Sequence, residues 1–145
     1  MTEKEIQEKY RPFISECSCD KCKGMCKRRP CWGTPDEMEK VINTEFVDRL
    51  MIDYWADLEG DIKIVCPAIK GYEKRCAPFW PTGQCSLFTP GGLCPLHNLG
   101  LKPIEGRVAS CITSEDDSLH GEIAEMWDTE KGRSVVQLFK QKIGE

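Results

Sequence analysis

The segment from Cys17 to Cys31 reads CSCDKCKGMCKRRPC and contains five cysteines in fifteen residues. Successive cysteines are separated by one, two, three and four residues, so tight turns can bring neighbouring thiols to one metal ion. Half of the intervening residues are Lys or Arg, which lower thiol pKa values and offset the negative charge of thiolates. The segment therefore predicts an irregular, cysteine-rich metal-binding core.

The other five cysteines are spread more widely. Cys85, Cys94 and Cys111 form a second group with gaps of eight and sixteen residues, and Cys66 and Cys76 lie between the two groups. A zinc site needs four thiolate or imidazole ligands, and an iron–sulfur cluster needs about four thiolates. Ten cysteines exceed one such site, so the sequence predicts either two sites or several cysteines that are not ligands.

We predict eight metal ligands, in the two groups Cys17, Cys19, Cys22, Cys26, Cys31 and Cys85, Cys94, Cys111. Cys66 follows the apolar run Ile62–Val65, where a cysteine can serve as a small buried apolar side chain. Cys66 and Cys76 are therefore the weakest candidates. His97 lies three residues after Cys94 and is a candidate for a mixed Cys/His site, with a strand-end histidine as the alternative. His120 is expected at the surface.

Composition limits the classes of function. The net charge of −4 argues against general nucleic-acid binding, which depends on neutralising phosphates. The polar start, Met1-Thr2-Glu3-Lys4-Glu5, lacks the features of a secretory signal, and no apolar run is long enough to span a bilayer. We therefore expect a cytoplasmic protein with reduced thiols and no membrane contact. A disulfide framework is the alternative to the metal centre, because the number of cysteines is even.

The regions around the cysteines predict a small α+β fold with about four helices and a short hairpin. Residues 2–14 are expected to form a short amphipathic helix that ends near Pro12. Thr34 and Glu37 form a capping-box pattern, which predicts a helix over 35–42. A second helix is expected over 45–55, where apolar side chains recur at helical spacing.

The central and C-terminal regions complete the predicted fold. Residues 62–65 alternate and are β-branched, which predicts a strand. Two short strands over 84–88 and 93–96 are expected to form a hairpin with one cysteine on each arm. Apolar residues at helical spacing over 119–143 predict a C-terminal helical segment, and Asp128 or Thr129 is placed to cap its last helix. We expect one domain over residues 1–145, with residues 17–111 as its metal-binding core.

The cysteine pattern resembles the YkgJ-type cysteine-cluster family, which is described as putative zinc- or iron-chelating domains. The matching features are the leading cysteines, the Thr34-Pro35-Asp36-Glu37 helix start, the Gly-x-Cys motifs around Cys85 and Cys94, and Arg107 ahead of Cys111. The chain departs from the family in lacking an adjacent Cys-Cys pair and the Arg-Pro before the last cysteine. The resemblance covers about residues 17–111 and implies metal chelation. A flagellin lysine N-methylase is similar in its cysteine motif.

Several functions fit these observations. The first is a metal-binding module, and the second is an iron–sulfur-dependent enzyme of oxidoreductase or methyl-transfer type. The third is an interaction protein with structural zinc and an unknown protein partner. The sequence has no Ser-His-Asp arrangement, P-loop or dinucleotide fingerprint, so it does not decide whether the protein is an enzyme. Glu105 and Arg107 flank Gly106 and are candidates for an ion pair beside the second cysteine group.

Overall fold

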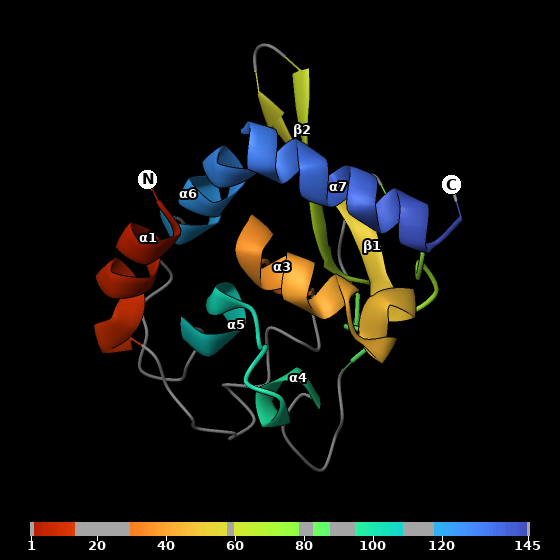
Figure 1. Ribbon diagram of the computed structural model, residues 1–145, viewed down its shortest axis with the longest axis horizontal. Helices are drawn as coiled ribbons and strands as arrows, with labels where there is room; N and C mark the ends of the chain where they lie inside the picture. Colours follow the sequence, from red (N-terminus) through yellow and green to blue (C-terminus); the bar gives the residue numbers. More distant parts are fainter. Residues whose placement is uncertain are drawn as a thin grey trace.

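The computed structural model describes residues 2–13, 30–57, 60–78, 83–87, 95–108 and 118–144 (Figure 1). It contains two strands, β1 (Leu50–Asp57) and β2 (Gly60–Pro67), which pair as an antiparallel hairpin. Its α-helices are α1 (Glu3–Tyr10), α3 (Pro35–Ile42), α4 (Pro95–Asn98), α5 (Ile104–Val108), α6 (Ser118–Trp127) and α7 (Glu130–Lys142). Two 3-10 turns are η1 (Arg11–Phe13) and η2 (Glu45–Arg49). The predicted class, a small α+β fold, is confirmed, and its hairpin lies at residues 50–67.

The hairpin of β1 and β2 forms the centre of the fold. The register pairs Ile52 with Val65 and Asp53 with Ile64, so the strand predicted over 62–65 lies within β2. Every residue over 50–53 and 64–67 is buried, so buried and exposed positions do not alternate along these parts of the strands. Successive strand residues point to opposite faces, so both faces of the hairpin are covered here. Figure 1 shows α7 passing across the hairpin and α3 lying below α7, and α3, α6 and α7 all pack against β2.

The helix predicted over 45–55 is wrong. The chain instead forms the short turn η2 and then enters β1 at Leu50. The prediction failed because the apolar residues of this segment happen to recur at helical spacing. A strand covered on both faces has no alternation of polar and apolar residues, so β1 lacks the pattern that identifies a strand. Pairing with β2 satisfies the backbone of these residues, and this tertiary contact overrides their local pattern.

The hairpin predicted over 84–88 and 93–96 is also wrong where the structure describes it. Cys85 forms an isolated antiparallel bridge with Ile69, and the Ser86 N–H donates to the Ala68 carbonyl at 2.7 Å. The backbone at 84–86 therefore pairs with 68–70. Leu96 lies in the short helix α4, while residues 88–94 lie outside the described part of the chain.

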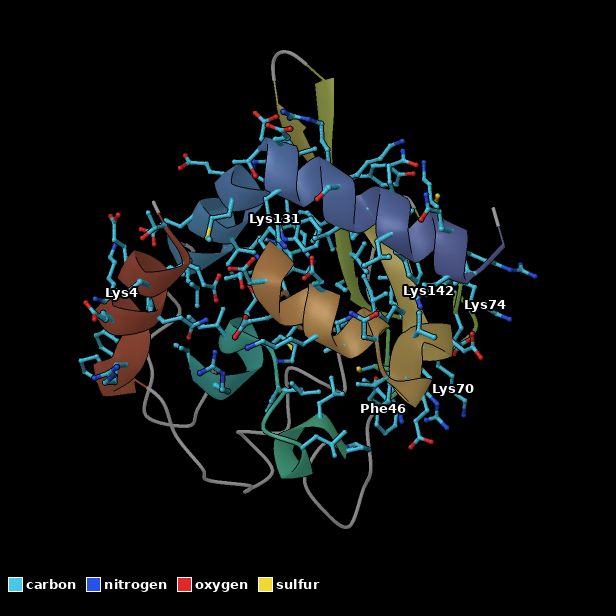
Figure 2. All side chains as sticks on the ribbon, in the orientation of Figure 1. Lys4, Phe46, Lys70, Lys74, Lys131 and Lys142 are labelled. Atoms are coloured by element: carbon cyan, nitrogen blue, oxygen red, sulfur yellow. The ribbon has the colours of Figure 1, made fainter. Side chains whose placement is uncertain are left out.

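The predicted helix starts are confirmed at α3 and α7. Thr34 and Glu37 make the reciprocal capping box, with the Glu37 N–H donating to Thr34 Oγ1 at 3.2 Å and the Thr34 N–H donating to Glu37 Oε1 at 3.0 Å. Thr129 caps α7 by accepting from the Gly132 N–H at 3.1 Å. Lys131 lies between α7 and α3 in Figure 2, and its Nζ is 2.6 Å from Glu39 Oε2.

The amphipathic helix predicted over 2–14 is confirmed as α1 with η1, and it buries Ile6 and Tyr10. Buried apolar side chains form a cluster that joins α1, α3, the hairpin, α6 and α7. Its largest fully buried members include Trp127, Phe139, Met38, Leu50 and Ile64. Among the described residues, no helix is long and apolar enough to cross a membrane.

Candidate metal centre

Two of the eight predicted ligands lie in the described part of the chain, and both are buried. Cys31, the last cysteine of the first group, is 4% exposed and sits in the extended segment before α3. Cys85, the first cysteine of the second group, is also 4% exposed and is held by its bridge to Ile69. The other predicted ligands lie outside the described residues: Cys17, Cys19, Cys22, Cys26, Cys94 and Cys111.

Cys66 and Cys76 differ sharply in environment. Cys66 lies in β2 and is fully buried. Burial raises the pKa of the Cys66 thiol well above its usual value, and the nearby negative charges of Asp53, Cys85 and Glu105 add to the increase. A thiol with a pKa raised in this way stays neutral near pH 7. Cys76 is exposed and accepts a hydrogen bond from the Tyr54 hydroxyl at 3.0 Å. No disulfide joins any two of Cys31, Cys66, Cys76 and Cys85.

The short helix α5 lies directly against Cys31. A Cβ atom placed on Gly106 would lie 2.8 Å from Cys31 Sγ, so the helix backbone approaches this thiol very closely. The negative charge of the preceding residue, Glu105, contributes to the raised pKa of the Cys66 thiol, after burial and the charges of Asp53 and Cys85. Only a glycine at 106 allows this approach without displacing Cys31.

Glu105 is the centre of a buried polar cluster that we call the Glu105 cluster, consisting of Trp32, Asp53, Glu105 and His120. One Glu105 oxygen accepts from the Trp32 backbone N–H at 3.0 Å, and the other lies 2.6 Å from His120 Nδ1. The Trp32 indole N–H donates to Asp53 Oδ2 at 3.1 Å. Asp53 and Glu105 are 7% and 5% exposed, so both carboxylates depend on these partners for stabilisation.

Aromatic contacts fix the imidazole of His120 within this cluster. Its ring stacks on Trp32 with a centroid distance of 3.6 Å and an interplanar angle of 19°. Trp55 meets the same ring edge-on at 5.4 Å. The prediction that His120 lies at the surface is therefore wrong, since the side chain is only 17% exposed. The sequence contains no local pattern that would reveal this position, because its partners come from three distant segments.

Glu105 and Arg107 do not pair with each other. Arg107 binds Glu37 and also donates to Gln7 Oε1 at 2.8 Å, whereas Glu105 binds His120. Residues two apart in a helix point to opposite sides, which explains the separate partners. Arg107, Glu37 and Gln7 line a small polar cavity of about 270 Å³ between α1, α3 and α5.

In the described part of the chain, no group of three or more His, Cys, Asp or Glu side chains is arranged to hold a metal ion. The arrangement there supplies single ligands, Cys31 and Cys85, and a partly buried imidazole with a carboxylate partner. Comparison of the chain with protein-family models, with curated proteins and with solved structures finds no match in any of the three.

Proposed function

We propose that this protein binds a metal centre, zinc or an iron–sulfur cluster, through its clustered cysteines. The observation that carries the proposal is the burial of Cys31 and Cys85, one thiol from each cysteine group. The remaining proposed ligands are Cys17, Cys19, Cys22, Cys26, Cys94 and Cys111. The YkgJ-type resemblance supports the same assignment.

The chemistry of the cysteine groups supports a metal more than simple apolar packing. A single buried cysteine is ordinary in a protein core. Five cysteines among basic residues in the segment 17–31 are not required by packing, and Lys and Arg favour the thiolate form that metals bind. A structural metal would contribute to folding directly, on the order of 10 kcal/mol for zinc.

The large supply of thiolates and the small number of imidazoles favour an iron–sulfur cluster slightly over zinc. An iron–sulfur-dependent enzyme of oxidoreductase or methyl-transfer type is the second candidate, and an interaction protein with structural zinc is the third. A cytoplasmic location, where thiols remain reduced, is part of the proposal.

Metal content and the visible spectrum of protein purified without oxygen test the proposal. A brown protein with iron and sulfide supports the iron–sulfur cluster, and a colourless protein with bound zinc supports the zinc site. A protein that holds neither metal and has its thiols in disulfides would contradict the proposal.

Single variants then test the ligands. We expect Cys31→Ser and Cys85→Ser to lower bound metal, because serine is a much weaker ligand for these metals. Cys76→Ser is the matched control, since Cys76 is exposed and lies outside the proposed ligand set. Equal metal loss in all three variants would refute the ligand assignment. Gly106→Ala adds a methyl group against Cys31 Sγ and is expected to weaken metal binding without removing a ligand.

A further inference from the structure

We propose that His120 supplies an imidazole ligand to the metal centre and that Glu105 positions it. This inference rests on the proposed metal-binding function and names a ligand outside the cysteine groups. It also selects between the two histidines of the chain, His97 and His120.

The hydrogen bond between His120 and Glu105 engages one nitrogen of the imidazole, Nδ1, and leaves the other, Nε2. His120 Nδ1 lies 2.6 Å from Glu105 Oε2, and when Glu105 is an ionised carboxylate, which can only accept, Nδ1 carries the proton and donates. In the neutral ring this leaves the lone pair on Nε2. Among the described residues, Nε2 makes no hydrogen bond. Metal-binding histidines in proteins usually donate their second N–H to a carboxylate or carbonyl in this way.

The surroundings of His120 hold the ring in one orientation. Trp32 stacks on one face, and Trp55 meets the ring edge-on. Glu105 is itself fixed, because its other oxygen accepts from the Trp32 backbone N–H. Such packing reduces the entropy that a ligand loses when it binds a metal.

The cluster also lies beside a proposed cysteine ligand. Trp32, which stacks on His120, directly follows Cys31 in the chain. Gly106, whose Cβ position is 2.8 Å from Cys31 Sγ, directly follows Glu105. The Cys31 thiol lies against Gly106 and the His120 imidazole bonds to Glu105, so the two groups meet consecutive residues of α5. An imidazole nitrogen together with thiolates is a common ligand set for zinc and also occurs in some iron–sulfur clusters.

X-ray absorption at the edge of the bound metal tests the proposal, because imidazole gives a distinct multiple-scattering pattern. We expect this pattern in the wild-type protein and in the His97→Gln variant, and its loss in the His120→Gln variant. With only two histidines in the chain, His97→Gln is the matched control. Circular dichroism shows whether each variant remains folded. If His120→Gln does not fold, the His97→Gln variant makes the same distinction, because an imidazole pattern that persists in it comes from His120.

The outcomes separate this proposal from the proposed function. Bound metal with sulfur ligands alone overturns the role of His120 and leaves the cysteine centre in place. An imidazole pattern that persists in His120→Gln also overturns it. A protein without bound metal overturns both proposals.

Glu105→Gln tests the positioning role separately. Loss of a carboxylate partner of a metal-binding histidine typically lowers metal affinity 10–100-fold, and we expect a loss of that size. Glu122→Gln is the control, because Glu122 lies on the same helix as His120 but pairs with Lys9 and Tyr10. Unchanged metal affinity in a folded Glu105→Gln variant would show that the ion pair is purely structural.

Discussion

Two helical glycines, Gly121 in α6 and Gly132 in α7, are expected to respond in opposite directions to the same substitution by alanine. Within the described part of the chain, an added Cβ at Gly121 would meet only Trp55 Cζ2 at 4.0 Å, which is an ordinary contact. An added Cβ at Gly132 would lie 2.3 Å from the Trp127 carbonyl oxygen and 2.6 Å from two further backbone atoms of Trp127. Replacement of glycine by alanine inside an exposed helix normally stabilises a protein, so the contact at Gly132 has to reverse the usual sign.

The geometry gives the size of each effect. Gly121→Ala should stabilise the fold by about 0.5–1 kcal/mol through helix propensity. Relieving the contact at Gly132 requires the α6–α7 turn to move by about 1 Å, because the blocking atoms are backbone and cannot rotate away. Trp127 is fully buried and its indole N–H donates to the Gly33 carbonyl at 2.9 Å, so this movement disturbs the core. We expect Gly132→Ala to destabilise the fold by about 2–3 kcal/mol.

Urea denaturation of both variants, in the same metal-loading state as the wild-type protein, measures these changes. In a thermal unfolding experiment, the midpoints of Gly121→Ala and Gly132→Ala should differ by about 10 °C for a chain of this length. A Gly132→Ala variant as stable as the wild-type protein would refute the close approach of α6 and α7. A destabilised Gly121→Ala variant would show instead that α6 is not an ordinary helix at that position.

Two further predictions concern charge. Glu37→Gln keeps the acceptor for the helix cap but places an amide N–H₂ against the Arg107 guanidinium, and we expect urea denaturation to show that the fold loses about 1.5–3 kcal/mol of stability. The control Glu39→Gln, on the exposed side of α3, should change stability by less than about 1 kcal/mol. Equal losses in the two variants would contradict the stabilising role of the Glu37–Arg107 ion pair. Burial and the charge of Asp53 raise the pKa of Cys66, so the unfolded metal-free chain loses this proton first as pH rises above about 8.5. The free energy of unfolding should then fall with increasing pH until the folded pKa is passed, whereas it should be insensitive to this group below about pH 8. Unfolding curves of reduced, metal-free protein at several pH values test this, and Cys66→Ala should show a smaller decline; an identical decline would contradict the assignment to Cys66.

Local patterns predicted the parts of the fold that depend on near neighbours in the chain. The capping box at Thr34 and Glu37 and the cap at Thr129 were found because each joins residues three apart. The strand β2 was found because its residues are β-branched. β1 was missed because burial on both faces removes the alternation that identifies a strand. The pairing of 84–86 with 68–70 was missed because the choice of strand partner depends on which backbone groups meet in space.

The candidate site divides in the same way. The two cysteine groups and their basic neighbours are visible in the sequence, because ligand spacing and charge are local properties. The Glu105 cluster is not visible there. Its hydrogen bonds join residues 73, 21 and 15 positions apart. His120 therefore looked like an ordinary residue at a helix start, and only the packing of α6 against α5 and Trp32 encloses it.

The sequence by itself determined the chemistry that this protein can offer, namely ten thiols, two imidazoles and a basic segment among the first five cysteines. The tertiary structure decided which of these groups share one environment. It buried Cys31 and Cys85, kept Cys76 at the surface and set His120 against Glu105. The physical reason is that burial and long-range hydrogen bonds arise only when distant segments pack together, and no spacing along the chain specifies that packing.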